Sequence, residues 1–350
     1  MNKFEFSISS INHSIKIKKF INQNWKKDHI LTKNKKLLDW QYRNKNGYNF
    51  VLASEPNFEF INGILGFIEP NRYSKKYTSG LYWLALWIVK KSSRPGLGVG
   101  LIKYLIKRFN VKIISTVGLS SDAIQIYKAL KYNVGKMDHF FIFNDCLNKF
   151  SILKINKKFK KIKNLPDKKS INLIEIQKNE IRDNRKKLNA CRTNIFPLKD
   201  FEYINKKYLK HPFYSYRLFV TYEIDKPSKP TSIIIMRVIN VKKSSILRII
   251  DFLGDKNVLL KLEKEFKKVL YREGHEYIDL LVHGMDKNKM KMSGYRIVND
   301  NNFIVPNLFE PFKKINIDVH FAYKFFDKNI KNKEFFIFKG DGDKERPNLI

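Results

Sequence analysis

An apolar run at 81–89 limits the possible folds of this chain more than any other segment, because it leads through a glycine-rich turn into an amphipathic stretch. The run has the length of a buried strand, and the apolar residues repeated every four positions up to Phe109 indicate a helix. In the turn, SSRPGLGVG at 92–100, the glycines allow a sharp bend, and the helix start offers unpaired N–H groups at its positive end. The combination favours an anion-binding site.

Spacing alone leaves the anion undetermined. A P-loop requires Lys and then Ser or Thr after its last glycine, whereas Gly100 is followed by Leu101 and Ile102. A dinucleotide-binding fingerprint requires an early strand–helix–strand unit and an acidic residue ~20 positions further on. Here the turn follows a hairpin, and no acidic residue stands at the right place after Val111. A turn without ligand and a cradle for another phosphate both remain open.

The first 150 residues alternate helical and extended patterns, which is an α/β order. The expected elements are, in chain order, helices at 11–24 and 33–43, strands at 48–55, 61–70 and 81–89, a helix ending near 109, a strand at 111–119, a helix at 120–133 and a strand at 139–144.

The pattern then runs a second time, with an offset of roughly 160 to 170 residues. The segment 206–223 echoes 39–55, and the strand at 277–284 matches the one at 111–119. We therefore expect an α/β (α+β) protein of two tandem domains, each a mixed sheet flanked by helices: residues 1–150, a basic connector at 151–170, and a degenerate copy at 171–350. The second copy has one glycine, Gly254, where the first has its turn, so only the first half is expected to hold a pyrophosphate.

The net charge of +36 raises the question of a polyanionic partner. The lysines are spread along the whole chain, beside abundant Asn and Ile, and the densest cluster, at 157–170, lacks the glycine and aromatic pattern of an RNA-binding motif. We interpret the charge as compositional and expect no nucleic-acid partner. A basic surface still attracts small molecules that carry several phosphates.

Location and redox state follow from what the sequence lacks. No apolar run approaches the ~18 residues of a membrane span, and the N-terminus has no apolar signal-peptide region. Two cysteines, Cys146 and Cys191, make neither a disulfide framework nor a metal site. We expect a cytoplasmic protein without a metal.

The order hairpin, strand, R-P-G-L-G turn, helix, strand, helix resembles the GNAT acyltransferase superfamily over about residues 30–145. That family opens its pyrophosphate-binding helix with Q/R-x-x-G-x-G/A, which corresponds to 93–98 here. Ser93 stands at the Gln/Arg position, and Arg94 lies one position late. The second signature, N-x-x-A-x-x-L-Y-x-x-x-G-F, is matched at Ser120, Ala123, Ile126 and Tyr127, with Lys131 and Tyr132 in place of Gly-Phe.

The resemblance implies an acyl-CoA co-substrate and direct attack of an amine on its thioester. Tyr127 would protonate the departing thiolate, although a tyrosine on an amphipathic helix is also a common core residue. The resemblance assigns coenzyme A binding to Leu86, Trp87, Ile88, Arg94, Gly96, Leu97, Gly98, Val99 and Gly100. Backbone groups of 86–88 would hold the pantetheine arm and polarise the thioester carbonyl.

The sequence does not single out one residue as the general base that would take a proton from the attacking amine. His283 ends the strand of the second half and would face a cleft between the halves, so it is the preferred candidate. His139, His211 and the carboxylate Asp39 are alternatives, and each histidine taken singly also suits a structural role.

Two GNAT-like halves and the ending FFIFKGDGDKERPN at 335–348 resemble bacterial nucleotide-sugar N-acyltransferases of O-antigen or capsule synthesis. The resemblance implies a dTDP- or UDP-linked amino sugar as acceptor, and a homodimer is possible. The substrate-binding candidates are Asp39, His211, Asp341, Asp343 and Arg346, although the tail also reads as a solvated acidic end. The alternatives are a GNAT enzyme that acylates a peptide, RNA or antibiotic amine, and a non-enzymatic nucleic-acid-binding protein.

Overall fold

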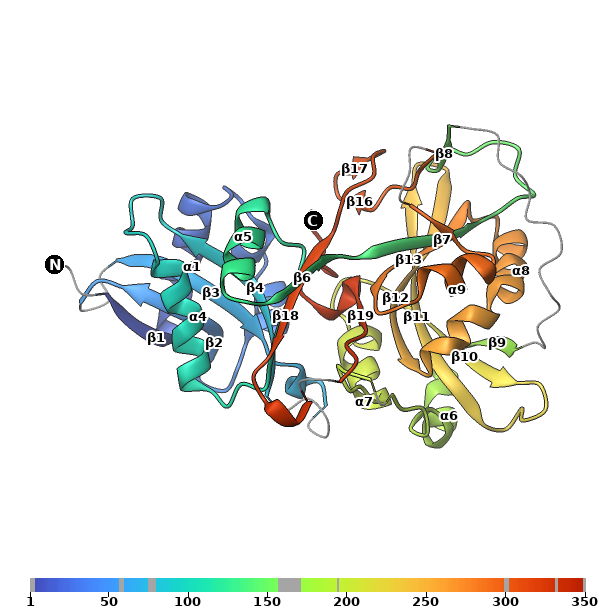
Figure 1. Ribbon diagram of the computed structural model, residues 1–350, viewed down its shortest axis with the longest axis horizontal. Helices are drawn as coiled ribbons and strands as arrows, with labels where there is room; N and C mark the ends of the chain where they lie inside the picture. Colours follow the sequence, from blue (N-terminus) through green and yellow to red (C-terminus); the bar gives the residue numbers. More distant parts are fainter. Residues whose placement is uncertain are drawn as a thin grey trace.

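The computed structural model describes residues 4–56, 60–74, 80–156, 171–193, 195–298, 302–330 and 333–348. It consists of two lobes side by side, each built on a mixed sheet with helices packed against it (Figure 1). The N-terminus lies at the far end of the first lobe, whereas the C-terminus lies between the two lobes.

The first lobe contains a sheet of order β1-β2-β3-β4-β5-β18-β6. Its strands are β1 (Glu5–Ser10), β2 (Gly47–Ser54), β3 (Ile61–Ile68), β4 (Leu81–Val89), β5 (Ile113–Val117), β18 (His320–Phe325) and β6 (Asn133–Lys136). Helices α1 (Ser14–Asn24), α2 (Ile30–Lys33) and α3 (Lys35–Tyr42) pack on one face, and α4 (Leu97–Arg108) and α5 (Ser121–Ala129) pack on the other. Apolar residues from both sides of β4 therefore enter different cores.

The second lobe contains the order β14-β7-β13-β12-β11-β10-β9, with β19 paired to β13. Its strands are β9 (Ile171–Ile176), β10 (Arg217–Glu223), β11 (Pro230–Val241), β12 (Ser244–Gly254), β13 (Tyr277–His283), β7 (Asp138–Phe143), β14 (Arg296–Ile297) and β19 (Ile337–Phe338). The helices are α6 (Ile181–Leu188), α7 (Phe201–Ile204), α8 (Glu263–Glu273) and α9 (Lys287–Met292). Two small pairs, β8 (Lys154–Ile155) with β15 (Phe303–Ile304) and β16 (Leu308–Phe309) with β17 (Phe312–Lys313), complete the lobe.

The two sheets repeat one strand order, and they exchange one strand with each other. Strand β18, from the C-terminal part of the chain, lies between β5 and β6, and β7, from the N-terminal part, lies at the corresponding place between β13 and β14. In each lobe a single parallel pair, β4 with β5 and β12 with β13, stands at the same position in an otherwise antiparallel sheet. The α/β class, the mixed sheets and the two copies expected from the sequence are confirmed.

The expected boundary at residue 150 does not coincide with the change of sheet. The strand expected at 139–144 is formed by β7, but it pairs with β13 of the second lobe and not within the first. The change of lobe thus falls between β6 and β7, after Lys136. Of the expected connector, residues 157–170 lie outside the described residues. Sequence patterning could not reveal the exchange, because a strand presents the same alternation whichever sheet accepts it.

A buried charge cluster holds the exchanged strand β7 in the second lobe. Asp279 on β13 accepts two hydrogen bonds from Arg248 on β12 (2.9 and 2.5 Å) and lies 2.8 Å from Nε2 of His139 on β7. Burial alone would raise the pKa of Asp279, but Arg248 and His139 outweigh it and lower that pKa to about 2. His139, an alternative base candidate in the sequence, is thereby committed to a structural contact.

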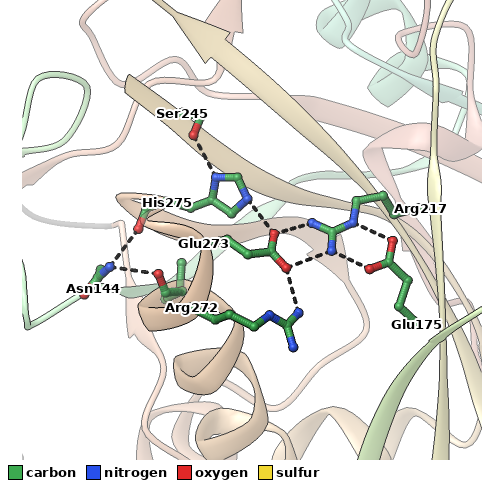
Figure 2. A network of polar contacts seen from close by, with 8 residues as sticks. Asn144, Glu175, Arg217, Ser245, Arg272, Glu273 and His275 are labelled. Atoms are coloured by element: carbon green, nitrogen blue, oxygen red, sulfur yellow. Dashed lines mark hydrogen bonds and ion pairs between the residues drawn. The ribbon is translucent and has the colours of Figure 1, made fainter. Parts of the chain in front are cut away.

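A second polar network secures the end of β7 and the far edge of the same sheet (Figure 2). Asn144 donates to the carbonyls of Leu270 and His275, and the His275 ring contacts both Ser245 (2.7 Å) and Glu273 (3.0 Å). Glu273 in turn binds Arg217 on β10, which also forms two hydrogen bonds with Glu175 on β9. The network connects helix α8 to three strands, so its role is structural.

Replacing Asp279 by Asn should lower the free energy of unfolding by about 3–5 kcal/mol, because Arg248 then remains buried without its carboxylate. Urea unfolding at pH 7 measures the loss. The matched control, Asp318→Asn, removes an exposed carboxylate that pairs with Lys136, and should cost no more than about 1 kcal/mol.

The same variant tests the pH dependence. The pKa of Asp279 is lower in the folded protein than the ~3.9 of an unfolded chain, so its contribution is present above pH 4 and is lost as the pH falls toward 2. The difference between the wild type and Asp279→Asn should therefore shrink over that range. A difference that stays constant with pH would contradict the assignment.

Candidate functional site

The glycine turn forms the start of helix α4. Gly96 caps the helix with a left-handed backbone (φ 86°), and among the described residues no atom lies within 4 Å of the position that its Cβ would take. A left-handed φ favours glycine, and the open space leaves the first amides of the helix accessible. Since α4 runs for 12 residues, its dipole adds to these N–H groups.

A cavity of about 450 Å³ lies over this helix start. Its walls are the turn and first residues of α4, the end of β4 and the start of α5; they comprise Trp87, Val89, Lys90, Lys91, Ser93, Arg94, Pro95, Gly96, Leu97, Gly98, Val99, Ser120, Asp122, Ala123 and Ile126. Three cations, Lys90, Lys91 and Arg94, lie on the side of the turn. The cavity therefore combines a helix N-terminus, positive side chains and the volume of a cofactor-sized ligand.

Trp87 explains why the second glycine of the turn is needed. Its indole N–H donates to the carbonyl of Gly98 (3.2 Å), and a Cβ on Gly98 would lie 3.1 Å from the ring. Gly100 has a different neighbour: a Cβ there would lie 2.7 Å from the ring of Phe6 on β1. Gly100 does not line the cavity among the residues that the structure describes, so its place in the sequence motif reflects packing against β1.

Strand β4 is bulged beside this cavity. Leu65 on β3 faces Trp87, whereas Phe67, two residues on, faces Leu84, so β4 carries one extra residue between them. On its other edge β4 pairs with β5 only from Leu81 to Trp83, within a stretch, 80–156, that is described throughout. Beyond Trp83 the two strands part.

The parting leaves the backbone of 84–89 without a ladder partner on the β5 side, within the described stretch 80–156. Leu86 and Ile88 turn their side chains into the core, and Trp87 faces the cavity. The backbone amide of Leu86 donates to the hydroxyl of Tyr42 at the end of α3. The segment that the sequence assigned to the pantetheine arm thus borders both the cavity and the face covered by α3.

Tyr127 lies in the core next to the cavity. Its ring centroid is 5.5 Å from Trp87 and 4.9 Å from Tyr132, and burial raises its pKa above the ordinary value, so the phenol is protonated at neutral pH. The residues of α5 that line the cavity end with Ile126, and Tyr127 is 1% exposed. The position suits both the core role and the proton-donor role that the sequence left open.

In the second lobe, strands β12 and β13 part in the same way, but β19 fills the opening between them. Strands β12 and β13 pair only over Leu247–Ile249 and Ile278–Leu280 in the described parts of the chain. On the same edge of β13, β19 pairs with Val282 and His283, because the opposite edge is occupied by β7. A Cβ on Gly340, just after β19, would lie 2.5 Å from the carbonyl of Ile250 on β12. The second lobe therefore offers no equivalent cradle there.

The tail then crosses to the first lobe. Gly342 lies against Val117 at the end of β5 (3.3 Å from its Cβ position), and the side chain of Lys344 covers Gly118. Asp343 and Arg346 are both buried, and both act electrostatically on Tyr42. The residues 341–346 thus run from the filled split of one lobe to the open split of the other, which places the ordered tail beside the candidate site.

A buried ion cluster anchors the tail. Lys199 lies 2.5 Å from both Asp251 on β12 and Asp341 in the tail, and Tyr208 donates to Asp251 (2.7 Å). Lys207 donates to the carbonyls of Gly340 (2.7 Å) and Asp341 (3.1 Å), and burial lowers the pKa of Lys207 to about 8. Asp341, expected as a substrate contact, is committed to this cluster.

The other candidates for acceptor binding or for the general base lie in different surroundings. Asp39 accepts from Tyr48 (2.6 Å) and pairs with Lys35, so its carboxylate is occupied by two partners of the first lobe. His211 lies between the lobes; its Nδ1 accepts from the amides of Phe213 and Tyr214, and burial lowers its pKa to about 4. His283 rests on Phe321 of β18, 4.3 Å between ring centroids, and burial lowers its pKa as well.

The structure brings forward neighbours of Asp39 that sequence reasoning missed. On α3, Trp40 and Gln41 face a small enclosed hollow between the lobes, which His211 and Asp343 also line. Asp39 precedes them by one and two positions, and each step along a helix turns ~100°. In the motif DWQY it is therefore Trp40 and Gln41, and not Asp39, that face this hollow.

Comparison with known proteins supports the fold. No family model and no curated protein matches the sequence. Among solved structures, the chain is similar to a GCN5-related N-acetyltransferase from Anabaena variabilis ATCC 29413, with 13% identity, a TM-score of 0.53, and coverage of 93% of this chain and 73% of that one. A probable N-acyltransferase from Enterococcus faecalis V583 gives 7% identity, a TM-score of 0.52, and 92% and 72% coverage.

A third similar structure is a GCN5-related glucosamine N-acetyltransferase region of a fungal multi-domain β-N-acetylglucosaminidase. It has 11% identity and a TM-score of 0.52, and the match covers 93% of this chain and 38% of that one. The chain has the fold of the GCN5-related N-acetyltransferases (GNAT), and the strand order is present twice.

Two further observations are limited to the described residues. None of the helices there combines the length and apolar character that crossing a membrane requires. The same residues contain no group of three or more His, Cys, Asp or Glu side chains placed to hold a metal ion.

Replacing Lys199 by Met should destabilise the protein by about 3–5 kcal/mol, because Asp251 and Asp341 then share a buried site without their cation. Burial raises the pKa of an unpaired carboxyl, so the variant should regain part of its stability as the pH falls from 8 to 5. Urea unfolding at both pH values measures this. The control Lys206→Met removes an exposed pair with Glu202 and should change little; equal losses for the two variants would refute the anchoring role.

Proposed function

We propose that this protein is an acyl-CoA-dependent N-acyltransferase, of EC 2.3.1 type, that transfers an acyl group to the amine of a nucleotide-linked amino sugar. The observation that carries the proposal is the cavity of about 450 Å³ over the start of α4, which is lined by Trp87 and Val89 from the part of β4 that no longer pairs with β5. A helix N-terminus suits a pyrophosphate, and a split between strands suits an extended arm.

Coenzyme A would be held along this surface. Backbone amides of Gly96–Val99 and the cations Lys90, Lys91 and Arg94 would contact the phosphates. The unpaired backbone of 86–88 would hydrogen-bond the pantetheine arm and polarise the thioester carbonyl. Ser93 is too short to make the side-chain contact of the family's usual Gln or Arg, and Arg94 stands beside it.

The reaction follows from direct attack. The acceptor amine would form a bond with the thioester carbonyl carbon, the carbon–sulfur bond would break, and the thiolate would take a proton from Tyr127. The proton released by the amine would pass to His283 or to water; burial lowers the pKa of His283, so its imidazole is neutral and able to accept it.

Several features support a nucleotide-linked amino sugar as acceptor. The tail at 335–348 resembles that of nucleotide-sugar N-acyltransferases and lies between the lobes. Aromatic rings gather there, with Trp40 4.3 Å from His211 and 6.3 Å from Tyr73. One similar structure is a glucosamine N-acetyltransferase region. The proposal places the enzyme in the cytoplasm.

Thiol release tests the function directly. Purified protein is incubated with acetyl-CoA or a longer acyl-CoA and with dTDP- or UDP-linked amino sugars, and free thiol and the acylated sugar are measured. Thiol release that depends on the amino sugar is expected. The proposal would be refuted if the protein failed to bind coenzyme A. It would also be refuted if none of the amines tested produced thiol release.

Replacing Tyr127 by Phe should lower kcat at least tenfold and leave the Kd for coenzyme A within about twofold, because the phenol acts on the leaving group and not on binding. Steady-state kinetics and calorimetry measure the two effects. Tyr104→Phe, on α4, is the matched control and should retain wild-type kcat. Wild-type turnover in Tyr127→Phe would assign that residue to the core alone.

A further inference from the structure

Arg94 has an aromatic neighbour that the glycine motif does not predict. Its guanidinium lies over the ring of Phe4, with 5.2 Å between the guanidinium carbon and the ring centroid. A guanidinium within ~6 Å of a ring centroid is attracted to the face of the ring. Phe4 stands immediately before β1, so the start of the chain meets the glycine turn beside the cavity.

The alternation of β1 explains why a ring is present at this place. Successive side chains of a strand point to opposite faces of its sheet. Phe4, Phe6 and Ile8 share one face, and all three pack against the core that α4 covers. The pairing of Phe6 with Ala53 on β2 fixes this register. The face of β1 that supports α4 therefore extends to the residue that meets Arg94.

The backbone that carries Arg94 is fixed from the other side. The amide of Lys90 donates to the carbonyl of Asn62 on β3 (2.9 Å), and the amide of Ser93 donates to the carbonyl of Lys90 (2.9 Å). The hydroxyl of Ser93 lies 3.5 Å from the same Asn62 carbonyl, so it is turned toward β3. What remains free at Arg94 is its long side chain, whose many rotamers would cost entropy on binding a ligand.

The guanidinium keeps its hydrogen-bonding groups available. Arg94 is exposed and lines the cavity, and none of the carboxylates in the described part of the chain forms an ion pair with it. Stacking uses the face of the guanidinium, so the N–H groups in its plane can still bind a phosphate. Phe4 is not among the described residues that line the cavity, so it acts on a ligand only through Arg94.

We propose that Phe4 is a positioning residue for coenzyme A: its ring holds the Arg94 guanidinium at the cavity, where the guanidinium contacts a phosphate of the cofactor. The inference rests on the proposed N-acyltransferase function. Ser93 is committed to the turn, so Arg94 makes the side-chain contact from the next position. Holding a long side chain in advance lowers the entropy lost on binding, which offsets the shifted position. The first strand of the chain thus belongs to the cofactor site.

A double-mutant cycle in coenzyme A affinity, measured by calorimetry, tests this pair. Phe4→Leu keeps an apolar side chain but removes the ring, and should raise the Kd about threefold. Arg94→Met removes the charge and should raise the Kd about tenfold or more. In the Arg94→Met background, Phe4→Leu should have no further effect, because the side chain that Phe4 positions is then absent.

Two variants complete the design. Phe4→Trp retains a ring face and should keep the wild-type affinity. Arg108→Met is the matched control, because Arg108 stacks on Phe109 (6.0 Å) at the opposite end of α4, and its loss should leave the Kd unchanged. Equal weakening by Phe4→Leu in both backgrounds would assign Phe4 to the packing of β1 and overturn the inference. Wild-type affinity in Phe4→Leu would overturn it as well.

The inference and the proposed function fail in different ways. Coenzyme A binding without coupling between Phe4 and Arg94 would overturn the positioning role and leave the N-acyltransferase function standing. Coupling without thiol release from any amine tested would overturn the function and leave the positioning role standing. A wild-type protein that does not bind coenzyme A would overturn both.

Discussion

The reciprocal pairing of β7 and β18 is the interaction on which the rest of the structure depends. Each sheet is interrupted without the strand that the other half of the chain supplies, because β18 joins β5 to β6 and β7 joins β13 to β14. Backbone N–H and C=O groups at those edges would otherwise have to be satisfied by solvent or a neighbour. The exchange also determines where the tail goes: a chain that leaves β18 in the first lobe must return along the boundary between the lobes (Figure 1).

The two lobes use one structural feature in opposite ways. In each, a bulged strand parts from its parallel neighbour, at β4 and β5 in the first lobe and at β12 and β13 in the second. The first opening faces a glycine turn and a helix N-terminus, with a large cavity. The second is filled by β19, which pairs with β13, and by Gly340, which packs against Ile250 of β12. The filled opening fixes the tail that then completes the surroundings of the open one.

Particular residues show how far the sequence could predict the site. The glycine turn was identified as a cradle because φ above zero at Gly96 and contact with Trp87 at Gly98 are local requirements. Gly100 was included on the same local grounds, whereas the structure packs it against Phe6 of the distant strand β1. Asp39 was proposed because a carboxylate suits a base or a substrate contact, whereas the structure pairs Asp39 with Lys35 and Tyr48. Asp341 was assigned to substrate, but Lys199 holds it, a contact between segments far apart in the chain.

The sequence by itself determined the elements, the repeat and the glycine turn at the start of α4, because periodicity, capping and glycine placement act over a few residues. Tertiary structure decided which sheet each copy of one strand joins, which split stays open, and which side chains of α3 and the tail meet between the lobes. Those outcomes depend on pairing between segments distant in the chain. A strand or helix face carries no local mark of the partner that will cover it.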